Sequence, residues 1–177
     1  MKHKRNMAIR LMQLFAAALI LTVGGCGIYT FSGTSLQSDI KTIYVENIEN
    51  RAMQINPALS NMFTQALQDK YRRLTKLQMV ENDADLEVTG HIVSYEVTPT
   101  AVTADEVASR NRLTITVKIF YKNNKYPDEA FPEGRSFAAY QDYDSTVSLD
   151  AVQDALCQQI VETLVEDIFN ATVAEWR

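Results

Sequence analysis

The feature that most restricts the fold is a long helical pattern near the end of the chain that is apolar across much of its breadth. Ser148 is a good N-cap residue, and residues from Leu149 to about Ala174 follow a helical period. At 1.5 Å per residue this helix would be about 39 Å long. We expect its whole apolar breadth to pack on a sheet; the alternative is that its far end, with Trp176, meets a partner protein. The two adjacent apolar rows are Val152, Leu156, Ile160, Leu164 and Ile168, and Val161, Val165, Phe169 and Val173.

A second helical pattern lies near the middle of the chain, where Asn56 and Pro57 open it. Asn accepts the free backbone N–H groups of a first helical turn, and Pro is preset for the first helical position. The apolar residues that follow recur at spacings of three and four, which predicts one apolar stripe that packs flat on a sheet. This stripe comprises Leu59, Met62, Phe63, Ala66, Leu67, Tyr71 and Leu74.

Most of the remaining segments have the patterns of β-strands. Residues 112–121 alternate apolar and polar side chains most regularly, so one face of this strand is buried and the other is partly wet. The apolar residues of 85–97 change parity, which predicts a bulge or twist near Gly90. We expect an α+β fold, a two-layer sandwich in which two helices cover one face of a four- to five-stranded, mainly antiparallel or mixed sheet. Further strands are predicted at 40–46, 77–80 and 136–143, and Ile28, Tyr29 and Phe31 have strand character.

The first 25 residues have the order and size of a lipoprotein signal peptide. Basic residues precede the uncharged stretch from Leu11 to Val23, which is too short for a spanning helix of about 20 residues. Gly24 and Gly25 come directly before Cys26, whose thiol would accept a diacylglycerol. We expect residues 1–25 to be removed, residues 26–177 to form a single domain, and acyl chains such as palmitate on Cys26 to hold it at a membrane without any other cofactor. The basic residues are Lys2, Lys4, Arg5 and Arg10.

The second cysteine, Cys157, lies in the long helical pattern among apolar residues, where a free cysteine is most often a small buried hydrophobe. The alternative to lipidation is an ordinary signal peptide whose first mature cysteine, Cys26, pairs with Cys157. Strand-like residues begin at Ile28, almost directly after the lipid. This spacing places the domain against the bilayer surface or in something embedded in it.

The residues expected to remain after cleavage contain little that resembles a catalytic site. Loss of residues 1–25 leaves 13 Lys and Arg against 22 Asp and Glu, a net charge of −9, which disfavours nucleic-acid binding. His91 is then the one histidine, in a predicted strand, so a Ser/His/Asp or Cys/His arrangement is hard to assemble. Glu81, Asp83 and Asp85 form an acidic run that is typical of a solvated turn. We therefore expect no enzyme activity and no metal site.

Two loops contain clustered basic residues. The segment Thr98–Arg110 joins two strands and brings Arg110 and Arg112 to a hairpin end, where arginines could clamp the phosphates of an anionic lipid. The alternative is that they pair with neighbours such as Asp105 and Glu106. The segment Lys122–Arg135 also contains Lys122, Lys125, Tyr126, Phe131 and two prolines.

Short motifs in a fixed order carry a resemblance over nearly the whole mature chain. They are Cys26–Gly33, Ile40–Val45, Asn50–Ala52, Pro57–Leu59 before an amphipathic helix, Asp83–Leu86, Gly90, Tyr95 and Asn111–Leu113 at the start of an alternating strand. In these motifs the chain resembles the LptE family of lipopolysaccharide-assembly lipoproteins.

The resemblance implies the two-layer α+β fold, a lipid anchor on the periplasmic face of the outer membrane, and a role as plug and assembly partner of the LptD β-barrel. It also implies lipopolysaccharide binding, although the family's basic contact residues do not match here by motif, so Arg110 and Arg112 rest on charge and position alone. Two other classes remain open: a lipoprotein regulator of an envelope enzyme such as one of peptidoglycan synthesis, and an auxiliary lipoprotein of a lipid-transport ABC system.

Overall fold

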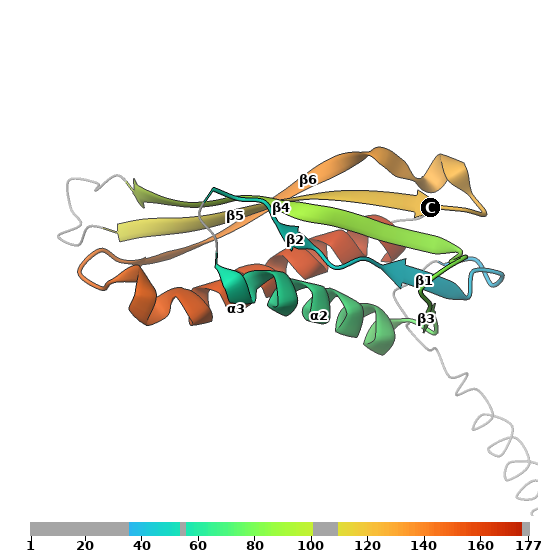
Figure 1. The fold of residues 1–177 in the computed structure, drawn as a ribbon, viewed down its shortest axis with the longest axis horizontal. Coiled ribbons are helices and arrows are strands. Elements are labelled where there is room, and N and C mark those ends of the chain that lie inside the picture. The colour runs from blue at the N-terminus through green and yellow to red at the C-terminus, as the bar shows by residue number, and fades with distance from the viewer. Residues whose placement is uncertain (1–35, 54–55, 101–109, 175–177) are drawn as a thin grey trace, which may run out of the picture. The chain divides into compact units, whose positions relative to one another are not determined.

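The computed structural model describes residues 36–53, 56–100 and 110–174, which belong to a compact unit, Ser32–Arg177. An open sheet forms one layer, and two long helices lie together on one of its faces (Figure 1). The strands are β1 (Thr42–Val45), β2 (Glu49–Asn50), β3 (Gln78–Met79), β4 (Leu86–Thr100), β5 (Arg110–Asn123) and β6 (Phe131–Asp144). The helices are α2 (Pro57–Leu74) and α3 (Leu149–Phe169), with a 3₁₀ turn at Pro127–Glu129 and a π-helical turn at Asn170–Ala174.

The sheet is mixed. Its order is β3-β1-β4-β5-β6, and β2 pairs with β4 beside this path. Strand β1 pairs in parallel with β3 and with β4, and β2 also pairs in parallel with β4. The long strands β4, β5 and β6 form an antiparallel meander. The predicted α+β class is confirmed. The sequence pattern missed the two-residue strand β2, and the predicted strand residues Ile28, Tyr29 and Phe31 lie outside the described residues.

Helix α2 begins as its sequence predicts. The Asn56 side chain accepts a hydrogen bond from the Ala58 N–H at 3.0 Å, and Pro57 occupies the first turn. Most of the predicted stripe is buried or packs partly buried against the core. Leu74 is an exception: it is the last residue of the helix and is 47% exposed.

Helix α3 buries both predicted apolar rows. Leu164, Ile168 and Val173 are fully buried, and Val152 packs partly buried against the core. The whole breadth of the helix is therefore core, while Trp176 lies outside the described residues. Ser148 occupies the N-cap position with extended backbone, but its side chain makes no capping hydrogen bond.

The long strand β4 contains the predicted change of parity. Ile92 pairs with Val117 and Ser94 pairs with Thr116, so Val93 is the extra residue of a bulge and is 45% exposed. The bulge lies three residues after Gly90. Gly90 itself is a point of close approach, because a Cβ there would lie 2.4 Å from the Lys118 carbonyl oxygen.

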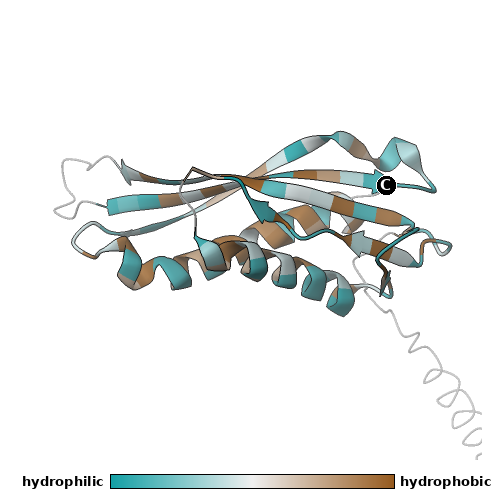
Figure 2. Cartoon of the chain, in the orientation of Figure 1, coloured by the Kyte–Doolittle hydropathy of each residue, from teal (hydrophilic) through white to brown (hydrophobic). Residues whose placement is uncertain are grey.

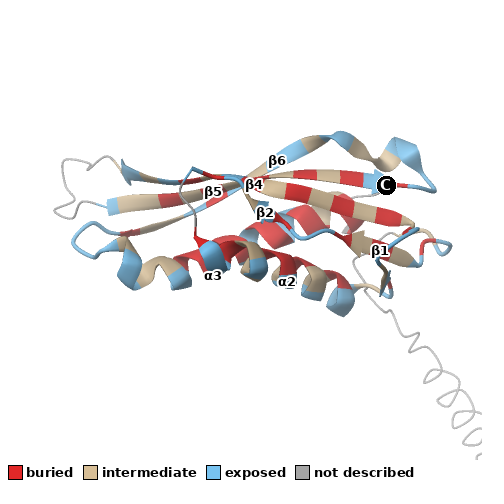
Figure 3. Ribbon diagram, in the orientation of Figure 1, coloured by how far each residue is buried: buried red, intermediate tan, exposed pale blue. Residues whose placement is uncertain are grey.

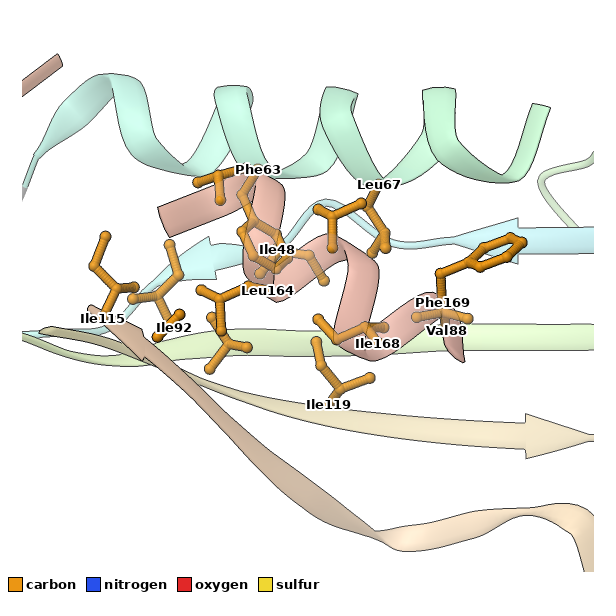
Figure 4. Close-up of a cluster of buried hydrophobic side chains, with 14 of the residues drawn as sticks. Ile48, Phe63, Leu67, Val88, Ile92, Ile115, Ile119, Leu164, Ile168 and Phe169 are labelled. Atoms are coloured by element: carbon orange, nitrogen blue, oxygen red, sulfur yellow. The ribbon is translucent and has the colours of Figure 1, made fainter. Parts of the chain in front are cut away.

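The core lies between the sheet and the helices. Figure 2 shows hydrophobic residues on the helix surfaces that face the sheet, and Figure 3 shows the same surfaces as buried. Phe63 and Leu67 of α2, with Leu164 and Ile168 of α3, meet isoleucines and valines of β4 and β5 (Figure 4). An ion pair between Lys70 and Glu166 joins the two helices outside this core.

Candidate functional site

The structure places Arg110 and Arg112 on one side of β5, at the end of the sheet where the β4–β5 connection begins. They are two residues apart in a strand and adjoin the buried Leu113, so both side chains project from the face opposite the helices. Asp144 and Asp142 of β6 lie directly across from them in register. The two predicted arginines are thus brought together, and two carboxylates that sequence reasoning did not connect with them join the cluster.

Arg112 is engaged with its cross-strand neighbour. Its Nε donates to Asp142 Oδ1 at 2.6 Å and its Nη2 donates to Asp142 Oδ2 at 2.9 Å, a two-pronged pair in which both side chains are partly exposed. The guanidinium also lies 3.7 Å from the centre of the Tyr140 ring. Its charge is therefore compensated, and its orientation is fixed by the neighbouring strand.

Arg110 is in a different situation. It is exposed, and the residues that the structure describes place no carboxylate within ion-pair distance of it. Asp144 lies opposite Arg110, but its carboxylate is hydrogen-bonded within the turn that follows β6. It accepts hydrogen bonds from the Thr146 hydroxyl at 2.7 Å and the Thr146 N–H at 2.8 Å. The proposed partners Asp105 and Glu106 lie outside the described residues.

The Arg112–Asp142 pair makes a titration prediction. The hydrogen bonds from Arg112 hold the pKa of the Asp142 carboxyl below its usual range, so Arg112→Gln is expected to raise that pKa towards the ordinary value of about 4. Because the folded pKa is depressed, the stability that the pair contributes is present above the unfolded pKa and is lost as pH falls through the folded value. Carbon NMR titration of the aspartate carboxyls measures this shift.

Asp144 is the matched internal control for that titration. Its pKa is lowered first by the Thr146 hydroxyl and then by the Thr146 N–H, which Arg112→Gln leaves in place. The pKa of Asp144 is therefore expected to remain low in the variant. An unchanged Asp142 pKa would contradict the assigned pair.

At the opposite end of the meander, the predicted basic loop Lys122–Arg135 holds the start of the described chain. Lys125 donates to the Asp39 carbonyl and lies 3.1 Å from Asp85 Oδ1, and the Tyr126 hydroxyl donates to the Asp39 carboxylate at 3.0 Å. These groups serve internal contacts.

Asp85 is more than a member of a solvated acidic turn. Its Oδ2 accepts the Lys41 N–H at 2.7 Å and the Thr42 N–H at 3.1 Å, which fixes the entry into β1. Burial pushes the pKa of this carboxyl up, but the hydrogen bonds from the Lys41 N–H, Lys125 and the Thr42 N–H together hold it below the usual range. Asp83 of the same run takes a turn conformation with φ of 52°.

His91 and Cys157 have structural surroundings. His91 lies in β4 opposite Lys118, and its ring centre is 6.1 Å from that of Phe120. Cys157 is fully buried, accepts a hydrogen bond from Asn56 Nδ2 at 3.7 Å, and has its thiol pKa raised by burial. A buried thiol of this kind is a poor nucleophile.

Within residues 36–53, 56–100 and 110–174, no group of three or more His, Cys, Asp and Glu side chains is placed to hold a metal ion. None of the helices described there is long and apolar enough to cross a membrane. Cys26 lies outside these ranges.

Comparison with protein families decides the relationship. A family model described as "LptE: Lipopolysaccharide-assembly" matches residues 40–172. This protein belongs to the LptE family. The matched residues include every described strand and both long helices. The match assigns the chain to a family of non-enzymatic lipopolysaccharide-assembly lipoproteins of the cell envelope. The search of curated proteins found no match.

Solved structures are similar to this LptE-family chain at low identity. Uncharacterized lipoprotein B from Nitrosomonas europaea is 9% identical with a TM-score of 0.50, and the match covers 75% of this chain and 85% of that one. A minor lipoprotein from Acinetobacter baumannii is 16% identical with a TM-score of 0.46, over 73% of this chain and 89% of that one. Because the TM-score of the second structure is below 0.5, only the first similarity supports an argument, and at 9% identity it supports the fold alone.

Proposed function

We propose that this protein is a lipid-anchored component of the outer membrane that plugs an LptD-like β-barrel and assists its assembly during lipopolysaccharide transport to the cell surface. The observation that supports this most strongly is the LptE family match over residues 40–172, which includes the whole sheet and both long helices. The described fold thus corresponds to the family's domain throughout.

Attachment to the membrane is the second part of the proposal. The signal peptide of residues 1–25 is cleaved, Cys26 takes up the acyl lipid, and residues 26–177 face the periplasm as one domain. Leu36, where the described chain begins, is ten residues after Cys26. Ten residues span at most about 36 Å, so the domain stays close to the leaflet that holds the lipid.

Capture of the partner tests the proposal. The tagged full-length protein, produced in its own cells and extracted in mild detergent, is expected to co-purify with a large outer-membrane barrel protein. Its depletion is expected to reduce lipopolysaccharide at the cell surface. An equally tagged, unrelated envelope lipoprotein is the control for capture of abundant barrels.

The same capture separates the other functional classes. A penicillin-binding protein as the specific partner would replace the proposal with regulation of peptidoglycan synthesis. Components of an ABC transporter would replace it with an auxiliary role in lipid transport. The proposal would also be contradicted if no barrel protein co-purified in repeated experiments, with and without cross-linking.

Lipopolysaccharide binding by Arg110 and Arg112 is a further part of the proposed function. We expect the two arginines to contribute unequally. Arg110→Gln is expected to weaken co-purification of lipopolysaccharide with the full-length protein several-fold, because its charge has no described ion-pair partner. Arg112→Gln is expected to have the smaller effect, because Asp142 already compensates its charge. Quantifying bound lipid by mass spectrometry compares the two variants, and equal or reversed losses would contradict this assignment.

A further inference from the structure

A pocket of about 650 Å³ opens at the C-terminal end of α2, far along the sheet from the two arginines. Two segments line it: residues 36–41 apart from Asp39, which precede β1, and residues 73–77, which are the last two residues of α2 and the three that follow. We call it the α2-end pocket. In Figure 1 the C-terminal end of α2, β1 and β3 lie together at one end of the sheet, and the end of β4 and the start of β5 lie at the other.

The α2-end pocket is basic, in a chain whose net charge is negative. Lys41, Arg73 and Lys76 line it and are exposed, and no carboxylate group lines it. Within the described residues none of the three forms an ion pair. The carboxylate of Asp39, the acidic residue of the first segment, accepts a hydrogen bond from the Tyr126 hydroxyl. The three cations are therefore available to an anion from outside the chain.

Apolar side chains line the pocket beside these cations. Ile40 and Leu77 are buried there, while Leu74 is 47% exposed. A pocket with an apolar floor and a cationic rim suits a ligand that has a phosphate group next to hydrocarbon.

Helix electrostatics account for part of this arrangement. Basic residues in the last turn of a helix are favoured by the partial negative charge of its C-terminus, which explains Arg72 and Arg73. Lys41 belongs to a different segment, and Lys76 lies beyond the helix. The exposed Leu74 also has no role in that explanation, so the helix terminus alone does not account for the pocket.

We propose that the α2-end pocket docks on anionic phospholipid headgroups of the bilayer that holds the acyl lipid. This inference rests on the lipid anchor of the proposed function. The short chain between Cys26 and Leu36, a pocket residue, keeps the pocket within reach of the headgroups. Each Lys or Arg near an anionic bilayer strengthens attachment by about fivefold, so three cations without an ion-pair partner among the described residues give the domain a defined side towards the membrane.

Hydrogen exchange of the full-length, processed lipoprotein in vesicles tests this docking. In phosphatidylethanolamine vesicles that contain phosphatidylglycerol, peptides covering residues 36–41 and 73–77 are expected to exchange at least about fivefold more slowly than in phosphatidylcholine vesicles. A peptide covering Ser136–Asp144 of β6 is expected to exchange equally in both.

Two matched triple variants identify the cause. The charge-removing variant, Lys41→Gln with Arg73→Gln and Lys76→Gln, is expected to lose the slowing. The charge-conserving variant, Lys41→Arg with Arg73→Lys and Lys76→Arg, is expected to retain it. Thermal melting of each variant checks that the fold survives loss of the helix-terminal charge.

The results that would overturn the proposal are distinct. Equal exchange in both vesicle types, or slowing that survives in the charge-removing variant, excludes docking through this pocket. Slowing in phosphatidylcholine vesicles with added lipopolysaccharide but not with phosphatidylglycerol would make lipopolysaccharide the ligand and would also overturn it. Failure of the lipid anchor itself would appear separately, as a protein that does not incorporate into any vesicle.

Discussion

Replacement of Cys26 with serine is expected to leave an uncleaved precursor that incorporates no labelled palmitate and does not reach the outer membrane. A serine hydroxyl does not replace the thiol as acceptor of the diacylglycerol, and the acyl chains supply the stable attachment at about 0.8 kcal/mol per buried methylene. Metabolic labelling with palmitate, gel mobility and membrane fractionation measure the three effects. Palmitate labelling that survives the substitution would refute the anchor.

Cys157→Ser is the matched control for this experiment. The Cys157 side chain is fully buried on α3, and Asn56 Nδ2 already donates to its sulfur, so a serine there keeps a hydrogen-bond partner. The variant is expected to be labelled, cleaved and localised like the unsubstituted protein. Loss of labelling in Cys157→Ser would show that the chosen readout responds to folding rather than to acylation.

Phe63→Ala is expected to lower the free energy of unfolding by about 3–5 kcal/mol. Phe63 is fully buried, and it lies in the cluster formed by α2, α3 and the sheet (Figure 4). Removing its ring leaves a cavity that two packed helices and a paired sheet are poorly able to close. Because a domain is stable by only about 5–15 kcal/mol, this loss would bring the protein close to unfolding.

Urea unfolding followed by circular dichroism measures the Phe63 effect. Gln65→Ala, on the exposed side of the same helix, is the matched control and is expected to change stability by less than about 0.5 kcal/mol. A loss below about 1 kcal/mol for Phe63→Ala would mean that the helices do not pack on the sheet as described.

Local sequence rules predicted the elements whose causes are local. The Asn56–Pro57 start of α2, the regular alternation in β5 and the parity change in β4 all depend on neighbouring residues, and the structure confirms each. Ser148 has the position of a cap but not its hydrogen bond, and Leu74 follows the helical period but is exposed at the last residue of the helix. These two differences arise at element ends, where the path of the chain outweighs periodicity.

The candidate site was less predictable because it depends on pairing between strands. Asp142 lies in the predicted strand 136–143, and Asp144 follows directly after that strand. Arg110 and Arg112 have the same spacing of two residues at the start of their own strand. This matching spacing was the one signal in the sequence that the four residues could pair. Which residues face each other depends on the register of β5 with β6, including the shift between Ile119 and Tyr121. The α2-end pocket likewise joins segments more than thirty residues apart, so no single stretch of sequence indicates it.

The bulge at Val93 has a consequence for how this chain tolerates changes in length. Apolar side chains face the helices at even-numbered positions before the bulge and at odd-numbered positions after it, so deletion of any β4 residue other than Val93 would turn the apolar side chains of one half of the strand out into solvent. Single-residue gains and losses among natural variants of this protein should therefore be confined to the connections between strands, with Val93 as the one position in β4 whose removal leaves both halves of the strand on their present faces, because Ile92 and Ser94 already pair with consecutive residues of β5.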